Sequence, residues 1–313
     1  VCQNIPTWGA GGERPSIEDG NLCIAAMIHA GSPFLLFRTG GTELKHVMHF
    51  MSERPPPQWM LDDLWRMSGI FPSDVKVWRE WMTTFANALM AATIYVDMFP
   101  LDWGVGVPIF HYHPDALRVQ WGSLVSFWNG DLAGIPDHGL PDSWVTALEG
   151  KTVLYVGSFP VTVAKQFHRN DTRCPKFREL KIVGTVQAYG GHVPAGYEGR
   201  TSIDAINDIT AAIDQQGEFD VALLSAGAYT APLAHHVFKK GRIAIYFGGS
   251  LQNLFGIKGH RWLGWFKSHV AKYPEERAWW VGPDRSEIPE RCTKAEDCAY
   301  FDKETMRMLG IVE

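Results

Sequence analysis

The sequence predicts an α/β fold of the Rossmann-like type, with a mostly parallel sheet, helices on both faces and a helical insertion in the N-terminal half. From about residue 150, short apolar runs rich in β-branched residues alternate with amphipathic helical segments, which is typical of a parallel sheet. A content of 46% hydrophobic and 20% charged residues fits a packed core. We expect one domain over residues 1–313, divisible into halves at 16–140 and 141–270 and a C-terminal tail at 271–313.

Five apolar runs have the length of a buried strand. The first, PFLLFR, lies between a proline-bearing turn and the glycines of TGGT. The other four follow in the second half of the chain, with helical segments between them. We therefore expect all five in one sheet: 33–38, 151–157, 180–187, 220–227 and 242–249.

Helix signals separate these runs. Ser16 precedes an acidic first turn and Gly31 ends the segment, as N-cap and C-cap residues do. A second helix is expected from about Glu43 to Ser52, where RPPP stops it. Residues 58–95 contain two segments with a helical pattern. An aromatic stripe at spacings of four in the second segment predicts a core-facing helix. Further helices are expected at 202–214 and 230–241.

Charge and hydropathy exclude two classes of partner. The formal net charge of −5 gives no basic surface for nucleic acid. No apolar run reaches the roughly 18–20 residues of a membrane-spanning helix, and the nearest, at 85–96, has the length of a buried helix. The sequence begins at Val1 without a signal-peptide pattern, which we expect of a processed form or of a domain excised from a longer protein. A soluble domain in the cytoplasm or in a lumen fits these observations.

The cysteine and tryptophan contents leave alternatives open. Cys292 and Cys298 lie six residues apart, which is compatible with a local disulfide in an oxidising compartment and equally with free thiols. Most of the 13 tryptophans are expected in the core or at interfaces, although some could stack on sugar rings.

Four predicted strand ends carry glycine or other small residues, at the edge where open parallel sheets bind ligands. Glycine lets backbone N–H groups approach an anion closely, and the following helix N-terminus adds about half a positive charge. One such turn could need its glycine for geometry alone. Four on one edge predict an anion-binding site: RTGGTE at 38–43, GSFP at 157–160, SAGAY at 225–229 and FGGSLQ at 247–252.

Charged residues near two of these turns suggest chemical roles. Arg38 could bind phosphate in a forked geometry, and Glu43 could hold a divalent metal or accept a proton from a sugar hydroxyl. An Arg38–Glu43 ion pair that only braces the turn is the alternative. Beyond the last strand, Lys258, His260 and Arg261 could neutralise a leaving diphosphate, with a solvated turn as the alternative.

Two further loops carry groups of catalytic type. Asp102 stands beside Trp103 in DWGVG. In FHYHPD, the spacing of His111, His113 and Asp115 could coordinate a metal, but no further cluster in the sequence completes such a site.

Two long segments, 147–167 and 218–262, resemble a family of proteins found among polysaccharide-assembly genes. The second segment ends in GGSLQNLFGIKGHRW, which resembles the family's GG-x-x-Q-x-x-FGI-x-G-x-RW run. PFLLFRTGGTEL at 33–44 resembles its R-x-G-x-x-E element, and DWGVG at 102–106 its D-W element. Together these segments cover about a third of the chain.

The R-x-G-x-x-E element is also similar to that of GT-D-type glycosyltransferases, a Rossmann-like fold that uses nucleotide sugars and typically reads R-x-G-D-G-E. This sequence keeps Arg38, Gly40 and Glu43 but has Gly41 in place of the aspartate, which removes an expected metal ligand. The resemblance implies a single GT-D-like domain, a UDP- or GDP-type donor and a glycan acceptor. A Mn²⁺ or Mg²⁺ ion, if one is used, would be held by Glu43.

The resemblance thus implies transfer of a sugar from a nucleotide-diphosphate sugar to a glycan or polysaccharide acceptor. Glu43 and Asp102 are the candidate catalytic residues. The candidate substrate-binding residues are Arg38, Gly40, Gly41, Thr42, Ser158, Gly227, Tyr229, Gly248, Gly249, Ser250, Gln252, Lys258, His260, Arg261 and Trp262.

Two other function classes stay open at this point. The first is another transferase of glycan assembly, such as a pyruvyl- or methyl-transferring enzyme; the turns lack a full G-x-G-x-x-G, which disfavours a dinucleotide. The second is a non-catalytic carbohydrate-binding domain, suggested by the abundant tryptophan and the missing aspartate. The sequence does not indicate the sugar, the acceptor, the stereochemistry or the oligomeric state.

Overall fold

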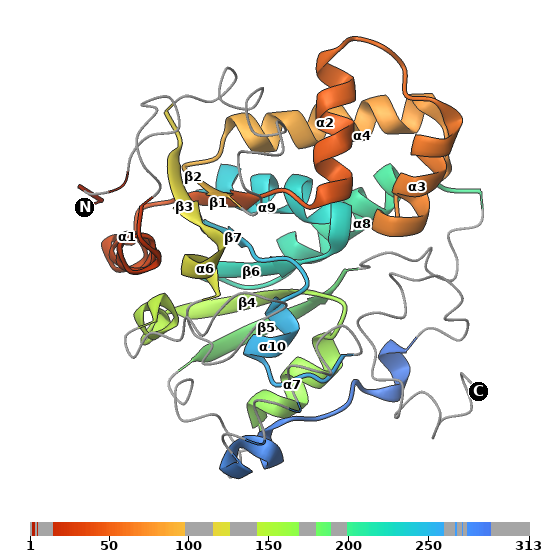
Figure 1. Ribbon diagram of the computed structural model, residues 1–313. Coiled ribbons are helices and arrows are strands. Elements are labelled where there is room, and N and C mark those ends of the chain that lie inside the picture. Colours follow the sequence, from red (N-terminus) through yellow and green to blue (C-terminus); the bar gives the residue numbers. More distant parts are fainter. Residues whose placement is uncertain are drawn as a thin grey trace.

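The computed structural model describes residues 2–3, 5, 15–97, 115–125, 143–168, 180–188, 199–259, 267, 271 and 274–288. Within these ranges seven strands form one sheet in the order β3-β2-β1-β7-β6-β4-β5, and each neighbouring pair is parallel (Figure 1). The predicted Rossmann-like α/β class is therefore confirmed. The strands are β1 (Leu35–Arg38), β2 (Ile94–Asp97), β3 (Leu117–Gln120), β4 (Thr152–Gly157), β5 (Lys181–Gln187), β6 (Val221–Ser225) and β7 (Ile243–Tyr246).

Each of the five predicted runs contains a strand, and the structure adds β2 and β3. The prediction of helix up to residue 95 is wrong, because α4 ends at Met90 and β2 begins at Ile94. The apolar run at 85–96 is thus divided between a helix and a strand. Its last residues are β-branched or aromatic and pair with Leu36–Arg38 of β1, so sheet pairing overrides the helical pattern.

The helices begin and end where the sequence places cap residues. The Ser16 side chain accepts the N–H of Asp19, and Gly31 is left-handed with φ 69°. Helix α2 starts two residues before the predicted Glu43. The α-helices are α1 (Ile17–Ala30), α2 (Gly41–Met51), α3 (Gln58–Ser68), α4 (Val75–Met90), α6 (Trp121–Leu124), α7 (Pro160–His168), α8 (Ser202–Asp214), α9 (Thr230–Lys239) and α10 (Leu251–Leu254); the 3₁₀ helices are η3 (Trp144–Leu148), η5 (Gly227–Tyr229), η7 (Pro274–Trp279) and η8 (Arg285–Glu287).

Helices cover both faces of the sheet, as predicted (Figure 1). On one face α4, α8 and α9 pack against alternate side chains of the central strands, among them Leu35 and Phe37 of β1. On the other face α1, α7 and α10 pack against the intervening side chains, such as Phe34 and Leu36. The period of two along β1 divides its side chains between two separate cores.

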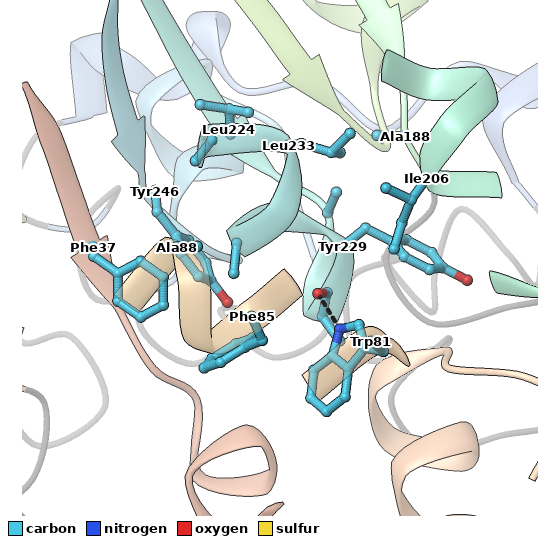
Figure 2. Close-up of a cluster of buried hydrophobic side chains, with 14 of the residues drawn as sticks. Phe37, Trp81, Phe85, Ala88, Ala188, Ile206, Leu224, Tyr229, Leu233 and Tyr246 are labelled. Carbon is cyan, nitrogen blue, oxygen red and sulfur yellow. Dashed lines mark hydrogen bonds between the residues drawn. The ribbon is translucent and has the colours of Figure 1, made fainter. Parts of the chain in front are cut away.

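The core on the α4 side is rich in aromatic rings. The Phe37 ring lies 5.4 Å from Phe85 and 5.6 Å from Tyr246, both edge to face. Trp81, fully buried on α4, donates its indole N–H to the Ala228 carbonyl at 3.0 Å (Figure 2). These contacts tie α4 to the ends of β1, β6 and β7. Truncating such a ring to alanine typically costs about 3–5 kcal/mol.

The connections after β1 and β7 leave the sheet on opposite faces. Strand β1 continues into α2, α3 and α4, and α4 lies on the face with α8 and α9. Its neighbour β7 continues into α10, whose Leu251 and Leu254 lie in the core of the other face. The carboxyl ends of β1 and β7 therefore form the topological switch point, where open α/β sheets bind their ligands.

A disulfide links Cys2 to Cys23 and attaches the N-terminal segment to α1. This pair was not predicted from the sequence. The candidate pair Cys292 and Cys298 lies outside the described residues. In the part of the chain that the structure describes, no helix is both long and apolar enough to cross a membrane.

Candidate functional site

Arg38 is the last residue of β1, and its side chain reaches over the neighbouring strand β7. Its guanidinium carbon lies 5.5 Å from the centroid of the Tyr246 ring, a cation–π contact worth about 0.5–2 kcal/mol. The Nε atom is buried and has no hydrogen-bond partner within the described ranges. Among the described residues no carboxylate pairs with Arg38, so the Arg38–Glu43 brace is not formed. A half-buried arginine without a counter-charge suits an anion.

Gly248 lets the guanidinium approach the turn after β7. Its φ of 77° lies in the left-handed region. A Cβ at this position would stand 2.6 Å from Nη2 and 2.7 Å from Nε of Arg38, closer than real contacts allow. Gly248 thus has two separate reasons to be glycine, the backbone conformation and the space that Arg38 occupies.

Helix α2 follows Arg38 and presents an N-terminus without a side-chain cap. Its N-cap residue is Gly40, which makes no capping hydrogen bond. Among the described residues no N-cap side chain accepts the first N–H groups of α2, and these groups, with the helix dipole, favour an anion. Gly41 and Thr42 open this helix.

Glu43 lies in the same first turn, and its side chain is buried, with 6% exposed. The carboxylate folds back toward Gly40: a Cβ there would stand 3.1 Å from the Glu43 Cδ. Among the described residues no cation pairs with this carboxylate. Glu43 therefore places a proton acceptor beside the anion-favouring turn.

His46 fixes α2 on α4. The Trp78 indole N–H donates to His46 Nδ1 at 3.0 Å in the protein interior. Because an indole nitrogen only donates, Nδ1 must carry no proton. Burial lowers the pKa of His46 to about 4, which keeps the ring neutral.

The turn after β7 carries buried polar atoms that have no hydrogen-bond partner in the part of the chain that the structure describes. Ser250 is 2% exposed and its Oγ makes no hydrogen bond. Asn253, one helical turn later, is fully buried, and neither its Oδ1 nor its Nδ2 has a partner. Such atoms are rare in folded proteins, because leaving them unpaired costs about 1–3 kcal/mol each. Ser250 and Asn253 follow β7, and Arg38 ends β1, the two strands whose carboxyl ends form the switch point. Asn253 was not predicted as a site residue, although it lies inside the GGSLQNLFGI run.

Several predicted binding residues make structural hydrogen bonds. The Gln252 amide donates to the Ile257 carbonyl at 3.1 Å and holds the turn closed. The Tyr229 ring is buried among side chains of α4, α8 and α9 (Figure 2), and its hydroxyl donates to the Gly69 carbonyl at 2.6 Å. The Gly227 carbonyl accepts from Tyr246 at 3.4 Å, beneath Arg38. These residues support the switch point, whereas Arg38 and Gly248 meet at it.

The turn after β4 differs from the turn after β1, because its anion position is filled by the protein itself. The Glu287 carboxylate accepts the backbone N–H groups of Val161 and Thr162, at 2.6 and 3.2 Å, and the Thr162 hydroxyl. Burial raises the pKa of Glu287, and the bonds from Thr162 and Val161 oppose that rise. Ser158 donates to the Ala188 carbonyl at 3.3 Å. The N-terminus of α7 is therefore capped by Glu287.

A buried ion pair lies at the end of β2, the strand on the other side of β1. Arg118 of β3 donates to Asp97 at 2.6 Å, and their side chains are 6% and 8% exposed. Thr39 and Tyr95 share a buried hydrogen bond of 2.7 Å next to Arg38. Asp97 was not predicted to lie at a strand end, because the segment before it was interpreted as helix.

Some candidates lie outside the described residues: Asp102, His111, His113, His260, Arg261 and Trp262. Gly249 and Lys258 are half-buried, and Lys258 donates its backbone N–H to the Val281 carbonyl at 2.8 Å. Within the described ranges no group of three His, Cys, Asp or Glu side chains could hold a metal.

The fold and the site define an open, doubly wound α/β protein with an anion-favouring switch point. No protein-family model matches the sequence, and no curated protein matches it significantly. Solved structures similar to it include the following two. One is a domain of unknown function 1792, with 10% identity over 87% of this chain and 91% of that chain and a TM-score of 0.46. The other is described as a new glycosyltransferase (DUF1792) from Streptococcus sanguinis, with 11% identity over 94% and 96% of the chains and a TM-score of 0.43.

Proposed function

We propose that the protein is a glycosyltransferase that moves a sugar from a nucleotide-diphosphate sugar to a glycan acceptor. The observation that carries the proposal is Arg38, a half-buried cation without a carboxylate partner among the described residues. It stands at the switch point, beside the uncapped N-terminus of α2. The motif resemblance at 33–44 and 248–262 supports the same function.

In this proposal the diphosphate lies along the turns after β1 and β7. The Arg38 guanidinium and the first N–H groups of α2 bind its oxygens, and Lys258 and Arg261 add positive charge. The acceptor hydroxyl oxygen attacks the anomeric carbon. The bond from that carbon to the diphosphate oxygen breaks, the nucleoside diphosphate leaves, and the hydroxyl proton passes to Glu43 or Asp102.

Among the described residues, few carboxylates are available at this site to bind a metal. Gly41 replaces the expected aspartate, and Asp97 is engaged by Arg118. Glu43 is the one carboxylate that the described residues place in the first turn of α2. These residues do not form a metal site by themselves, so we assign charge neutralisation to the cationic side chains and derive no step through a metal.

The disulfide between Cys2 and Cys23 supports the lumenal alternative for the location. Disulfide bonds persist in oxidising compartments and are rare where thiols are kept reduced. When the protein is purified without reductant and treated with an alkylating reagent, mass spectrometry should show that neither Cys2 nor Cys23 is alkylated. Alkylation of both without prior reduction would argue against this location.

The test is a panel of UDP- and GDP-sugars, assayed for donor hydrolysis and for thermal stabilisation, each with manganese and with chelator. We expect hydrolysis of at least one donor, and stabilisation by that donor and by its nucleoside diphosphate. Stabilisation by a methyl donor or by phosphoenolpyruvate alone would contradict the proposal. So would binding of oligosaccharides with no response to any nucleotide.

A further inference from the structure

The C-terminal strap, which we define as residues 279–288, is joined at one end to the segment that follows the switch-point turn. Lys258 N–H donates to the Val281 carbonyl at 2.8 Å, and Val281 N–H donates to the Gly256 carbonyl at 2.9 Å. The Trp279 indole lies against Gly256, where a Cβ would stand 2.8 Å from two ring atoms. The backbone of 256–258 is therefore held by the strap.

The other end of the strap is fixed on α7. The Glu287 carboxylate caps the helix by accepting two backbone N–H groups and the Thr162 hydroxyl. Asp284 N–H donates to the same Thr162 hydroxyl at 2.7 Å. The Asp284 carboxylate pairs with Lys165, which holds its pKa at about 2.

A third link joins α7 directly to both segments. The buried Gln166 amide donates to the Phe255 carbonyl at 3.2 Å and to the Trp279 carbonyl at 2.6 Å. Both of its N–H groups are thus used, one on each segment. Helix α7, the strap and residues 255–258 form one hydrogen-bonded unit that adjoins the switch point.

We propose that Glu287 is a positioning residue that, by clamping the strap to α7, fixes residues 256–259 and so orients Lys258 toward the diphosphate. This inference rests on the proposed function and deepens it, because it assigns a role to a residue far from the motifs. If the strap needed only an anchor on α7, an apolar side chain would provide one without the cost of desolvating a charge. A carboxylate that receives several directed bonds also fixes the orientation of the strap on α7.

Because Glu287 is buried, its removal should affect residues of the strap that it does not contact. Its side chain is 8% exposed, so removing it leaves the N–H groups of Val161 and Thr162 without acceptors. Hydrogen bonds to a charged group are stronger than those between neutral groups, so losing them should increase local opening by about ten- to a hundredfold. The opening should spread along the strap to the bridge between Ile257 and Val281.

The experiment combines amide hydrogen exchange on the ligand-free full chain with calorimetric binding of UDP and GDP. Glu287→Ala should speed exchange at both 280–288 and 256–259, and should weaken binding of the nucleoside diphosphate about tenfold. Gln166→Met, which removes the direct link, should speed exchange at 256–259 in the same way. Lys165→Gln is the matched control, because it removes a solvent-accessible ion pair between α7 and the strap but leaves the Glu287 and Gln166 hydrogen bonds, so exchange at 256–259 and nucleotide binding should stay unchanged.

The outcomes separate this inference from the proposed function. Faster exchange at 280–288 with unchanged exchange at 256–259 and unchanged binding would overturn the inference and leave the proposed function in place. Wild-type protein that binds neither nucleotide would overturn the proposed function and, with it, the role assigned to Glu287. If Glu287→Ala does not fold, Glu287→Gln keeps the side-chain volume and one acceptor oxygen, and the same two results decide.

Discussion

The two ends of strand β7 carry similar residues in different electrostatic settings. At the amino end, Gly241 has φ 74° and the Arg242 guanidinium lies 5.7 Å from the Phe219 ring. Arg242 also pairs with Glu218, so its charge is compensated.

At the carboxyl end, Gly248 has φ 77° and the Arg38 guanidinium lies 5.5 Å from the Tyr246 ring. No described carboxylate compensates Arg38. The same combination of glycine, arginine and aromatic ring thus occurs at both ends, but the arginine is paired with a carboxylate at the amino end and with no described carboxylate at the carboxyl end. An uncompensated, partly buried cation is costly to keep for structure alone, which is why we assign the carboxyl end to a ligand.

The largest effect is expected at Glu43. Glu43→Gln keeps the size of the side chain but removes the proton acceptor, so transfer should fall by about 10²–10⁴-fold while the fold stays intact. Initial-rate assays and circular dichroism measure the two. Glu218→Gln, at the amino end, is the matched control and should keep full activity. Turnover at the wild-type level in Glu43→Gln would remove Glu43 from the mechanism.

Lowering the pH should reduce the stability contributed by groups near the two ends of β7 over different pH ranges. His46 is neutral when folded, with a pKa lowered by burial to about 4 from 6.5. Its contribution to stability is therefore fully present above pH 6.5 and is lost as the pH falls toward 4, about 3 kcal/mol in all. At the amino end, Lys240 and His236 lower the pKa of Asp214, so its contribution is lost only below the ordinary carboxyl value of 3.8.

Denaturant unfolding between pH 7 and 4 measures this difference. The wild-type free energy of unfolding should fall over that range, and it should fall less in His46→Asn, which offers an amide oxygen to Trp78 and does not titrate. An equal slope in both proteins would show that the pH dependence arises elsewhere.

Arg38 should be separable from Arg242 by binding. Arg38→Met should weaken binding of the nucleoside diphosphate about 30-fold, because a charge-assisted contact is lost. Arg242→Met removes an arginine that also lies over a ring, and should leave binding unchanged. Isothermal calorimetry measures both. Equal affinities for the two variants would erase the distinction between the two ends.

The smallest effect separates the two glycines. Gly241→Ala meets no heavy atom within 4 Å, so it should cost only the left-handed backbone term, about 1 kcal/mol. Gly248→Ala has the same backbone term and also displaces the Arg38 guanidinium, so nucleotide affinity should fall as well. Thermal unfolding and calorimetry compare them. Unchanged nucleotide affinity in Gly248→Ala would contradict the packing of Arg38 against this turn.

The sequence predicted what depends on local pattern. Ser16 and Gly31 marked the ends of α1, and strand–helix alternation predicted the parallel sheet and the edge on which Arg38 and Gly248 lie. It missed β2, because the four residues Ile94–Asp97 continue an apolar run that begins in a helix. Only their pairing with β1, on a distant segment, decides their conformation.

The site was predictable only in part, for the same reason. The sequence can place Arg38 and Gly248 at strand ends, but it cannot show which helix N-terminus the protein caps for itself. Glu287 reaches α7 across 125 residues of chain, so no local pattern reveals the contact. The Asn253 side chain has no hydrogen-bond partner among the described residues, and nothing in its immediate sequence indicates that.

A crystal structure of the full chain with the nucleoside diphosphate that binds most tightly tests the central claim most directly. The account predicts diphosphate oxygens within hydrogen-bond distance of the Arg38 guanidinium and of the first N–H groups of α2. A diphosphate bound at another strand end, with Arg38 making no contact to it, would contradict the account.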